Sequence, residues 1–400
     1  MTIADRATPP QFHPSVPEVV TRDPPHLFHV FSSFEVGGQQ MRFAKIANRL
    51  ERRYRHTIVS VDGNTDCLDR LDPGLDVTVL PVDVEKGRAL SLRNLARFRR
   101  VLRDRRPDLL LTYAWGAVEW GLANRLPARC PHLHFEDGFG PDEAIGRHFR
   151  RRIWFRRVAL AGPTEVIVPS RLLERIALES WRIPRRRVRF IPNGIDCARF
   201  AAAPDGKALP PRRPGELLVG SVGTLRREKN FGRLLRAFAA LPPDPPARLV
   251  LIGDGPDRPA LEAAARDLGI GDRVDFRGNM MNPERALGLL DVFAISSDTE
   301  QMPLSLLEAM AAARPVVSTD VGDVRAMVTE ENRPLVVERD DEAALAAALR
   351  RLLTDATLRR RLGNANRARV VREYGEEAML ETYDRLFEAF SRPAPPQRPA

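Results

Sequence analysis

Short apolar runs alternate with helix-like segments along this chain, and the alternation occurs twice, on either side of a stretch rich in proline and glycine at residues 201–216. This pattern constrains the fold more than any other feature, because continuous apolar runs of this length suit strands that are covered on both faces of a parallel sheet. The two series therefore predict an α/β protein of two Rossmann-like domains. The expected strands lie at residues 27–31, 56–61, 77–82, 108–113, 132–136, 165–170, 188–192, 217–223, 248–253, 274–278, 291–296, 316–320 and 335–339.

The two series also suggest where the domains begin and end. We expect an N-terminal domain at residues 26–195 and a C-terminal domain at residues 196–375, with an unstructured leader at 1–25 and an unstructured tail at 391–400. Both end segments are rich in proline and lack a periodic apolar pattern, so they cannot bury enough apolar surface to fold.

The composition excludes several classes of protein. No apolar run approaches the length that a membrane-spanning helix needs, and the first residues contain no apolar segment of the kind found in secretion signals. The three cysteines, Cys67, Cys130 and Cys197, form no spaced cluster, so neither a disulfide scaffold nor a Cys-rich zinc site is expected. We therefore expect a cytoplasmic protein that is soluble or peripheral to the membrane.

The excess positive charge lies in the first half of the chain. The formal net charge is +10 at pH 7, and residues 1–195 hold 33 Lys and Arg against 22 Asp and Glu. Such an uneven distribution suggests an anionic partner for the first domain, such as a membrane surface, a lipid phosphate or a nucleic acid. A solvated arginine-rich surface is the alternative, because 59 of the 63 basic residues are arginine.

Ligands of parallel α/β sheets bind beyond the carboxyl ends of the strands, where helices begin. After the first expected strand, a Gly-Gly pair that ends at Gly38 opens a helix, and glycines there let backbone N–H groups approach a phosphate. A flexible turn is the alternative. After the first strand of the second series come Arg226, Arg227 and Lys229. Three cations before a helix suit a diphosphate, unless they are only solvated surface charges.

The most informative stretch follows the fourth strand of the second series. Pro303 suits the first turn of a helix, where its missing N–H is not needed. Glu300 lies in the loop before this helix and Glu308 in its second turn, with seven residues between them. The loop carboxylate can face a substrate hydroxyl, and the helix carboxylate can accept both hydroxyls of a ribose. The backbone N–H groups around Met302, Pro303 and Leu304 remain available for a phosphate.

A second polar cluster ends the strand expected at 132–136. Alternation along the strand places His132, His134 and Glu136 on one face, with Asp137 in the following loop. Histidines and carboxylates in such a cluster can do acid–base work, which makes His134 and Asp137 candidate catalytic residues. A purely structural hydrogen-bonded cluster is the alternative.

Taken in their order along the chain, these motifs resemble those of glycosyltransferase family 4. The members of this family are retaining nucleotide-sugar transferases of GT-B fold. The resemblance extends over residues 26–390 and implies an acceptor domain and a donor domain that face each other across a cleft. It also implies that a helix at 376–390 crosses back to the first domain. The most specific segment is EQMPLSLLEAMAAARPVVSTDVGDV, which carries the family's pair of glutamates with seven residues between them. The other matching segments are GGQQ, IPNGIDCARF, VGTLRREKN and LVLIGDGPDR.

The resemblance assigns roles to individual residues. It implies that Lys229 holds the donor diphosphate, that Glu300 faces the donor sugar and that Glu308 binds the ribose. The backbone positions expected to contact the phosphates or the base are Gly38, Arg277, Gly278, Met280, Met302, Pro303 and Leu304.

Two positions depart from the family pattern. The family usually has an arginine five residues before its lysine, where this chain has Thr224, so Arg226 or Arg227 is left to substitute for it. The family also often has two histidines, spaced H-x-x-H, after the fifth strand. His134 matches the first of them and Asp137 the second, so either the carboxylate replaces the imidazole or His134 does its work.

The implied reaction transfers a sugar, with retained anomeric configuration, from a nucleoside diphosphate to a lipid-linked or polysaccharide acceptor in cell-surface glycan synthesis. The transition state resembles an oxocarbenium ion, and the cations would stabilise the charge that develops on the departing diphosphate. No Asp-x-Asp motif lies near these residues, so we expect neither a metal nor another cofactor.

Other functions stay open on the sequence. A nucleic-acid-binding protein explains the basic first half but not the pair of glutamates, and few aromatic residues interleave the arginines. A sugar-nucleotide epimerase shares the fold type and would act on the donor alone. A dehydrogenase needs a G-x-G-x-x-G turn, and the segment at 253–256 lacks the third glycine. A binding protein without catalytic activity is the last alternative.

Two arginine-rich segments, at residues 93–106 and 147–158, are compatible with helices. In the second, Phe149, Ile153 and Trp154 share one side, and an apolar side beside arginines is the pattern of a helix that lies on an anionic membrane. The alternative is that the apolar side faces the core. We expect weak association with the inner face of the membrane. The arginines of this segment are Arg147, Arg150, Arg151, Arg152, Arg156 and Arg157.

Overall fold

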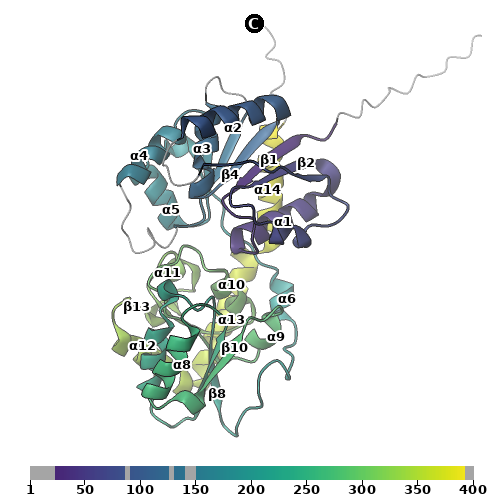
Figure 1. Ribbon diagram of the computed structural model, residues 1–400. Coiled ribbons are helices and arrows are strands. Elements are labelled where there is room, and N and C mark those ends of the chain that lie inside the picture. Colours follow the sequence, from purple (N-terminus) through teal and green to yellow (C-terminus); the bar gives the residue numbers. More distant parts are fainter. Residues whose placement is uncertain (1–22, 86–90, 126–129, 140–149, 392–400) are drawn as a thin grey trace, which may run out of the picture.

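The computed structural model shows two domains, each built on one parallel sheet with helices on both faces (Figure 1). The part of the chain that it describes comprises residues 23–85, 91–125, 130–139 and 150–391. The expected tail after Ser391 and all but the last three residues of the expected leader lie outside this part.

The sheet of the first domain has the strand order β3-β2-β1-β4-β5-β6-β7, and every neighbouring pair is parallel. The chain adds β2 and β3 on one side of β1 and then adds β4 to β7 on the other side. The strand order therefore reverses between β1 and β4, which is where Rossmann-like folds bind their ligands. Each strand falls on an expected apolar run, although β3 stops before Pro81, which cannot donate a backbone hydrogen bond to a neighbour. The strands are β1 (His26–Phe31), β2 (Arg55–Ser60), β3 (Val77–Val79), β4 (Leu109–Tyr113), β5 (His132–Phe135), β6 (Thr164–Val168) and β7 (Val188–Phe190).

Helices cover both faces of this sheet, as the apolar runs require. In β1, Leu27 and Phe31 point into the layer under α1 and α14, whereas Phe28 and Val30 point into the layer under α2 and α3. All four side chains are fully buried. The helices of the first domain are α1 (Gly38–Leu50), α2 (Leu92–Arg105), α3 (Val118–Asn124), α4 (Arg150–Ala159) and α5 (Arg171–Arg175).

The second domain repeats this plan with the strand order β10-β9-β8-β11-β12-β13, again parallel throughout. One layer of its core lies under α6, α9, α10 and α13, and the other lies under α7, α8 and α12. The strands are β8 (Leu217–Val222), β9 (Ala247–Ile252), β10 (Val274–Gly278), β11 (Val292–Ile295), β12 (Val316–Thr319) and β13 (Val336–Val337). The helices are α6 (Cys197–Ala201), α7 (Phe231–Ala239), α8 (Arg258–Asp267), α9 (Glu284–Leu287), α10 (Leu304–Ala311), α11 (Val324–Met327), α12 (Glu342–Thr354) and α13 (Ala356–Glu373).

The last helix, α14 (Glu376–Ser391), returns from the second domain and packs against α1 and β4 of the first (Figure 1). Tyr383 and Phe387 on this helix are buried in the core of the first domain. Where the chain crosses between the domains, a Cβ on Gly194 would lie 2.9 Å from the Cα atom of Glu376. Only glycine allows the outgoing and returning segments to approach this closely.

The apolar face predicted for the segment at 147–158 is only partly correct, and its first three residues lie outside the described part of the chain. Trp154 is 62% exposed, but Arg156 is completely buried. The Arg156 guanidinium pairs with Glu136 at 3.1 Å and lies over the rings of Trp115 and Trp181. A charged side chain can occupy the core here because it gains a carboxylate partner and aromatic faces.

Histidines are concentrated in the interior of the first sheet. Nε2 of His29 lies 3.0 Å from Nδ1 of His56, and Thr112 lies 2.8 Å from both His132 and His134. Burial, followed by repulsion from neighbouring histidines, lowers the pKa of His56 to about 4 and that of His132 to about 3. The folded domain therefore holds these rings neutral at pH values where the unfolded chain protonates them.

We expect the first domain to lose stability as the pH falls below 6.5, the ordinary histidine pKa. The unfolded chain binds more protons than the folded domain between this value and the lowered pKa values, so each such histidine removes about 1.4 kcal/mol of unfolding free energy per pH unit. All four tryptophans lie in the first domain, so urea unfolding followed by tryptophan fluorescence at pH 7, 6 and 5 measures the effect. A His132→Gln variant should show a shallower loss, and equal slopes in the two proteins would contradict the assignment.

Candidate active site between the two domains

A cavity of about 190 Å³ lies between the carboxyl ends of the two sheets. The first domain contributes Asp137, Gly138 and Phe139, which follow β5. The second contributes the loops that follow β8 and β11, with Arg226, Glu228, Lys229, Thr299, Glu300, Gln301 and Met302. The two loops of the second domain form one wall of the cavity, and Asp137 lies on the side of the first domain.

Glu300, a catalytic candidate, forms an ion pair with Lys229, a candidate for donor binding. Nζ of Lys229 lies 2.6 Å from Oε1 of Glu300, and both side chains are mostly buried. The Ser297 hydroxyl donates to the same carboxylate oxygen at 2.7 Å. A cation and an anion thus meet at the cavity wall, where a ligand phosphate could draw on Lys229 and a ligand hydroxyl on Glu300.

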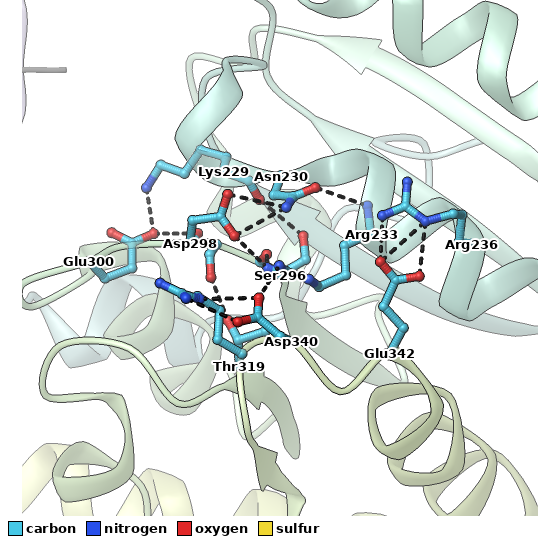
Figure 2. A network of polar contacts seen from close by, with 12 residues as sticks. Lys229, Asn230, Arg233, Arg236, Ser296, Asp298, Glu300, Thr319, Asp340 and Glu342 are labelled. Atoms are coloured by element: carbon cyan, nitrogen blue, oxygen red, sulfur yellow. Dashed lines mark hydrogen bonds and ion pairs between the residues drawn. The ribbon is translucent and has the colours of Figure 1, made fainter. Parts of the chain in front are cut away.

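A polar network behind this pair fixes the two loops to each other (Figure 2). Arg233 on α7 donates to the carbonyl oxygen of Ser296 at 2.9 Å and pairs with Asp298 at 2.8 Å. Asn230 adopts a left-handed backbone conformation, which Asn tolerates better than most residues, and its side chain both caps α7 and donates to Asp298. Because these contacts lie directly beside Lys229 and Glu300, they hold the pair in place without entering the cavity.

The N-terminus of α10 faces the first domain. Pro303 precedes the helix, and no side chain of the described residues caps it. A Cβ on Gly38, the first residue of α1, would lie 3.7 Å from Cδ1 of Leu304, so the starts of the two helices lie close together. Free N–H groups and the positive ends of two helix dipoles at one place favour a phosphate.

Glu308, one turn into α10, carries a perturbed carboxyl group. Burial raises its pKa to about 7, although Lys45 and Arg199 act in the opposite direction. A buried carboxylate lacks the hydrogen bonds that water would give it. A ligand that supplies hydroxyl donors, as a ribose does, therefore stabilises its charged form.

We expect Glu308→Gln to stabilise the ligand-free protein at pH 8. The folded pKa lies above the ordinary value of 4.5, so the carboxylate costs stability as the pH rises from 4.5 through 7. Glutamine removes that cost, which is at most about 3 kcal/mol. Melting temperatures should therefore differ at pH 8 and converge at pH 5. A variant that melts lower than the wild type at pH 8 would show that the carboxylate is structural.

Asp137 is the ionisable residue among those of the first domain that line the cavity, and hydrogen bonds hold both of its oxygens. Arg42 on α1 binds them at 2.5 and 2.8 Å, and Gln39 also donates to Oδ2. Arg42 further donates to Asn193 at 2.8 Å, and Asn193 donates to the carbonyl oxygen of Met302 at 3.4 Å. Asp137 is thereby connected to the crossing segment and to the second domain.

His134, the other catalytic candidate, lies elsewhere. It is completely buried in the sheet, with Nδ1 2.8 Å from the Thr112 hydroxyl, and it does not line the cavity. His134 and Asp137 were the two candidates for the role of the family's histidine. Of these, Asp137 is therefore the one with access to a ligand.

Of the remaining expected donor residues, only Arg226 and Met302 are among the described residues that line the cavity. Arg226 lines it and Arg227 does not, which favours Arg226 as the substitute for the arginine missing at Thr224. Arg277 and Gly278 end β10 at the edge of the second sheet, with the Gly278 carbonyl accepting from Gly253 at 2.8 Å. Met280 packs on the core below this loop.

Sequence reasoning missed several residues that organise the site, chiefly Arg42, Gln39, Asn193 and Arg233. Arg42 and Arg233 are buried although they lie on amphipathic helices. The only signal was a charged residue at a helix position flanked by buried apolar residues, as in the run from Phe231 to Leu235. The partner of each lies far along the chain, so spacing alone does not identify it.

The part of the chain that the structure describes contains no candidate metal cluster and no candidate membrane-spanning helix. No group of three or more His, Cys, Asp or Glu side chains in this part of the chain could hold a metal ion. Among the same residues, no helix combines the length and the apolar character needed to cross a membrane.

Two family profiles match the chain. The profile described as "Glycosyl transferase 4-like domain" matches residues 37–194, and the one described as "Glycosyl transferases group 1" matches residues 207–369. The first match begins after β1 and ends after β7, and the second includes all strands from β8 to β13.

Curated relatives are similar over part or most of their length. The lipopolysaccharide core biosynthesis glycosyltransferase LpsE of Rhizobium meliloti is 31% identical over 54% of this chain and 61% of its own length, so this chain spans less than two thirds of that relative. LpsD of the same organism is 28% identical over 73% of this chain and 78% of its own length. Among solved structures, HepE of Anabaena in complex with UDP superposes with a TM-score of 0.76 at 17% identity, over 91% of this chain and 100% of that chain. This last likeness concerns the fold.

Proposed function

The chain is a glycosyltransferase of the group 1 family, of the family 4 type and of GT-B fold, and from this we propose that it transfers a sugar from a nucleoside diphosphate to a glycan acceptor with retained anomeric configuration. The observation that carries the proposal is the Lys229–Glu300 pair, which lies in the cavity opposite Asp137 and beside the uncapped start of α10. UDP is the first candidate nucleotide, because HepE binds it in a similar fold.

The donor would lie along the second domain. Lys229 and Arg226 would bind the diphosphate together with the N–H groups of α10, while Glu308 accepts the ribose hydroxyls. The loop after Arg277 would contact the base. The cavity of about 190 Å³ is smaller than a typical ligand pocket, so it would hold only the sugar, between Glu300 and Asp137.

The reaction would proceed by departure of the diphosphate. The bond between the anomeric carbon and the phosphate oxygen breaks with both electrons on the oxygen, and Lys229 and Arg226 stabilise the charge that develops there. The acceptor hydroxyl attacks from the same face and gives its proton to the departing phosphate. The Asp137 carboxylate, held by Arg42, lies where positive charge develops on the sugar. These side-chain cations would do the work without a metal or other cofactor.

The acceptor would be a lipid-linked or polysaccharide glycan of the cell surface, as the names of LpsE and LpsD suggest for those relatives. The positive charge of the first domain is consistent with an acceptor presented at an anionic membrane on its cytoplasmic side.

A thermal-shift screen against nucleotide sugars tests the proposed donor. A ligand at 100 times its dissociation constant stabilises the folded protein by about 2.7 kcal/mol. We expect one class of nucleoside diphosphate sugar to do so. Proton NMR of the transfer product then reports the anomeric configuration, and an inverted product would contradict the proposed course of the reaction. Conversion of the donor to another sugar nucleotide without an acceptor would identify an epimerase instead.

We also expect weak binding to anionic vesicles through α4. Trp154 is exposed beside Arg150 and Arg151, and cations near anionic lipid contribute about 1 kcal/mol each. Co-sedimentation should occur with phosphatidylglycerol vesicles but not with phosphatidylcholine vesicles, and a few hundred millimolar salt should abolish it. Trp154→Ala should weaken it. Equal, salt-insensitive partitioning on both vesicle types would exclude this role for α4.

A further inference from the structure

A second groove, of about 580 Å³, lies on the first domain between β7, the start of α5 and the end of α14. This volume is typical of sites for small ligands. Because β7 is the edge strand of its sheet, no further strand covers the groove on that side. None of its lining residues lines the cavity between the domains, so the groove is a separate feature.

Four arginines line the rim of the groove. No acidic side chain lines it, and a single carboxylate behind it, that of Glu174, binds two of its arginines at 2.8 Å each. A third arginine pairs with Glu165, and Arg385 is 71% exposed with Glu381 3.9 Å away. Asp323 also lies close to Arg171, so each guanidinium has a carboxylate nearby, but none of these carboxylates belongs to the lining of the groove. The four arginines are Arg171, Arg185, Arg189 and Arg385.

The floor of the groove is apolar, and guanidiniums lie over its two aromatic rings. Val188, Ile191 and Leu386 contribute aliphatic surface. The guanidinium of Arg171 covers the Phe190 ring at 3.8 Å from its centroid, and that of Arg189 lies 5.8 Å from the centroid of Phe390. On the Phe190 ring, the Arg171 guanidinium competes with a nucleic acid base for a stacking position. An arginine rim around an aliphatic floor suits an anionic group that is carried on an apolar chain.

The groove is next to the active site along the chain. The Ser170 hydroxyl donates to Gln301, which lines the cavity, at 3.2 Å. The next residue, Arg171, lines the groove with its side chain, while its backbone N–H donates to Asp323 of the second domain at 2.6 Å. Two consecutive residues thus connect the two sites along the chain.

We infer that this groove binds the phosphate and the adjoining apolar chain of a lipid-linked acceptor whose sugar end lies in the cavity. The inference rests on the proposed glycosyl transfer, which supplies the reason for such a ligand. A phosphate suits the arginines because guanidinium groups bind it with paired hydrogen bonds, and the apolar chain covers the floor that a bare anion would leave in water.

Dodecyl phosphate, below its micelle concentration, is the probe for this chemistry, with inorganic phosphate and dodecyl maltoside as comparisons. We expect the wild type to bind dodecyl phosphate at least tenfold more tightly than either. Arg185→Gln/Arg385→Gln should weaken this binding at least tenfold. The matched control is Arg93→Gln/Arg103→Gln, which removes two exposed arginines from α2 and should leave the affinity unchanged.

Ala389→Glu keeps the test independent of the arginines. Ala389 is exposed on α14 and lines the groove, so a carboxylate there should repel the probe without disturbing the core. Ala389→Gln, of the same shape without charge, should retain more of the binding. Unchanged melting temperatures confirm that each variant is folded. Equal dodecyl phosphate affinity in the wild type and Ala389→Glu would overturn the inference, and so would equal affinity of the wild type for inorganic phosphate.

Vesicles distinguish the acceptor from the bulk membrane as the source of the phosphate. Co-sedimentation with phosphatidylglycerol vesicles should be unaffected by Ala389→Glu if the groove holds the acceptor. A parallel loss of vesicle binding would make the groove a membrane contact and overturn the acceptor assignment. Nucleotide-sugar binding is measured on the same variants, so failure of the proposed donor site is detected separately from failure of the groove.

Discussion

Replacement of Arg42 by leucine should destabilise the first domain by about 3 kcal/mol, because it leaves the Asp137 carboxylate without its guanidinium partner. Arg42 is 9% exposed and binds both oxygens of Asp137. Burial alone would lower the pKa of Arg42, but Asp137 raises it above its ordinary value, so Arg42 is charged at neutral pH. The effect lies at the lower end for buried pairs because Asp137 retains 21% exposure.

Urea unfolding of the single and double variants measures this effect. Arg42→Leu/Asp137→Leu removes both charges, so it should be more stable than Arg42→Leu alone. Nucleotide-sugar binding should survive in Arg42→Leu, since the donor lies on the second domain, whereas transfer should be lost. If the double variant is no more stable than the single one, the pair does not account for the burial of Arg42.

Lys229→Ala should lower kcat/KM for transfer about 30- to 150-fold, equivalent to 2–3 kcal/mol of lost transition-state stabilisation from one charged hydrogen bond. The Lys229 ammonium lies at the cavity wall with only Glu300 as its ion-pair partner among the described residues. It is therefore available to a diphosphate that develops charge. Lys229→Arg should restore part of the activity, because it restores the charge but not the compact ammonium group.

Lys207→Ala is the matched control, since Lys207 is an exposed lysine of the same domain that lies outside the cavity. It should leave kcat/KM unchanged. Steady-state rates at varied donor concentration, with melting temperatures as the check on folding, decide the matter. Wild-type rates in Lys229→Ala would remove this residue from the donor site.

The strands and the loops that carry the site could be predicted from the sequence because their signal is local. The central strands of the parallel sheets, such as β1, β4, β9 and β11, are buried on both faces, so each appears as an apolar run. Lys229, Glu300 and Glu308 follow such runs at fixed spacings, which is enough to place them at one end of a sheet. Lys229 and Glu300 meet because the strands that precede their loops, β8 and β11, pair directly.

The contacts that cross between distant elements could not be predicted in this way. Arg42 lies 95 residues before Asp137, and helical periodicity treats both Arg42 and Arg156 as solvent-exposed cations. The structure buries both because each meets a carboxylate that the pattern does not pair with it. The same limit applies to His134 and Asp137: alternation separates their faces, but only the tertiary structure shows which of them reaches the cavity.

The pH dependence of nucleotide-sugar affinity tests the central claim most directly, namely that Glu308 binds the donor ribose in the cleft. The ligand is the nucleotide sugar selected by the screen, whose diphosphate diester has no group that titrates between pH 6 and 8. With a pKa of about 7, Glu308 is mostly ionised at pH 8 and mostly protonated at pH 6, so calorimetric affinity should be about tenfold weaker at pH 6. Glu308→Gln should bind weakly at both pH values. Equal affinity of the wild type at pH 6 and 8, together with wild-type affinity in the variant, would contradict the account.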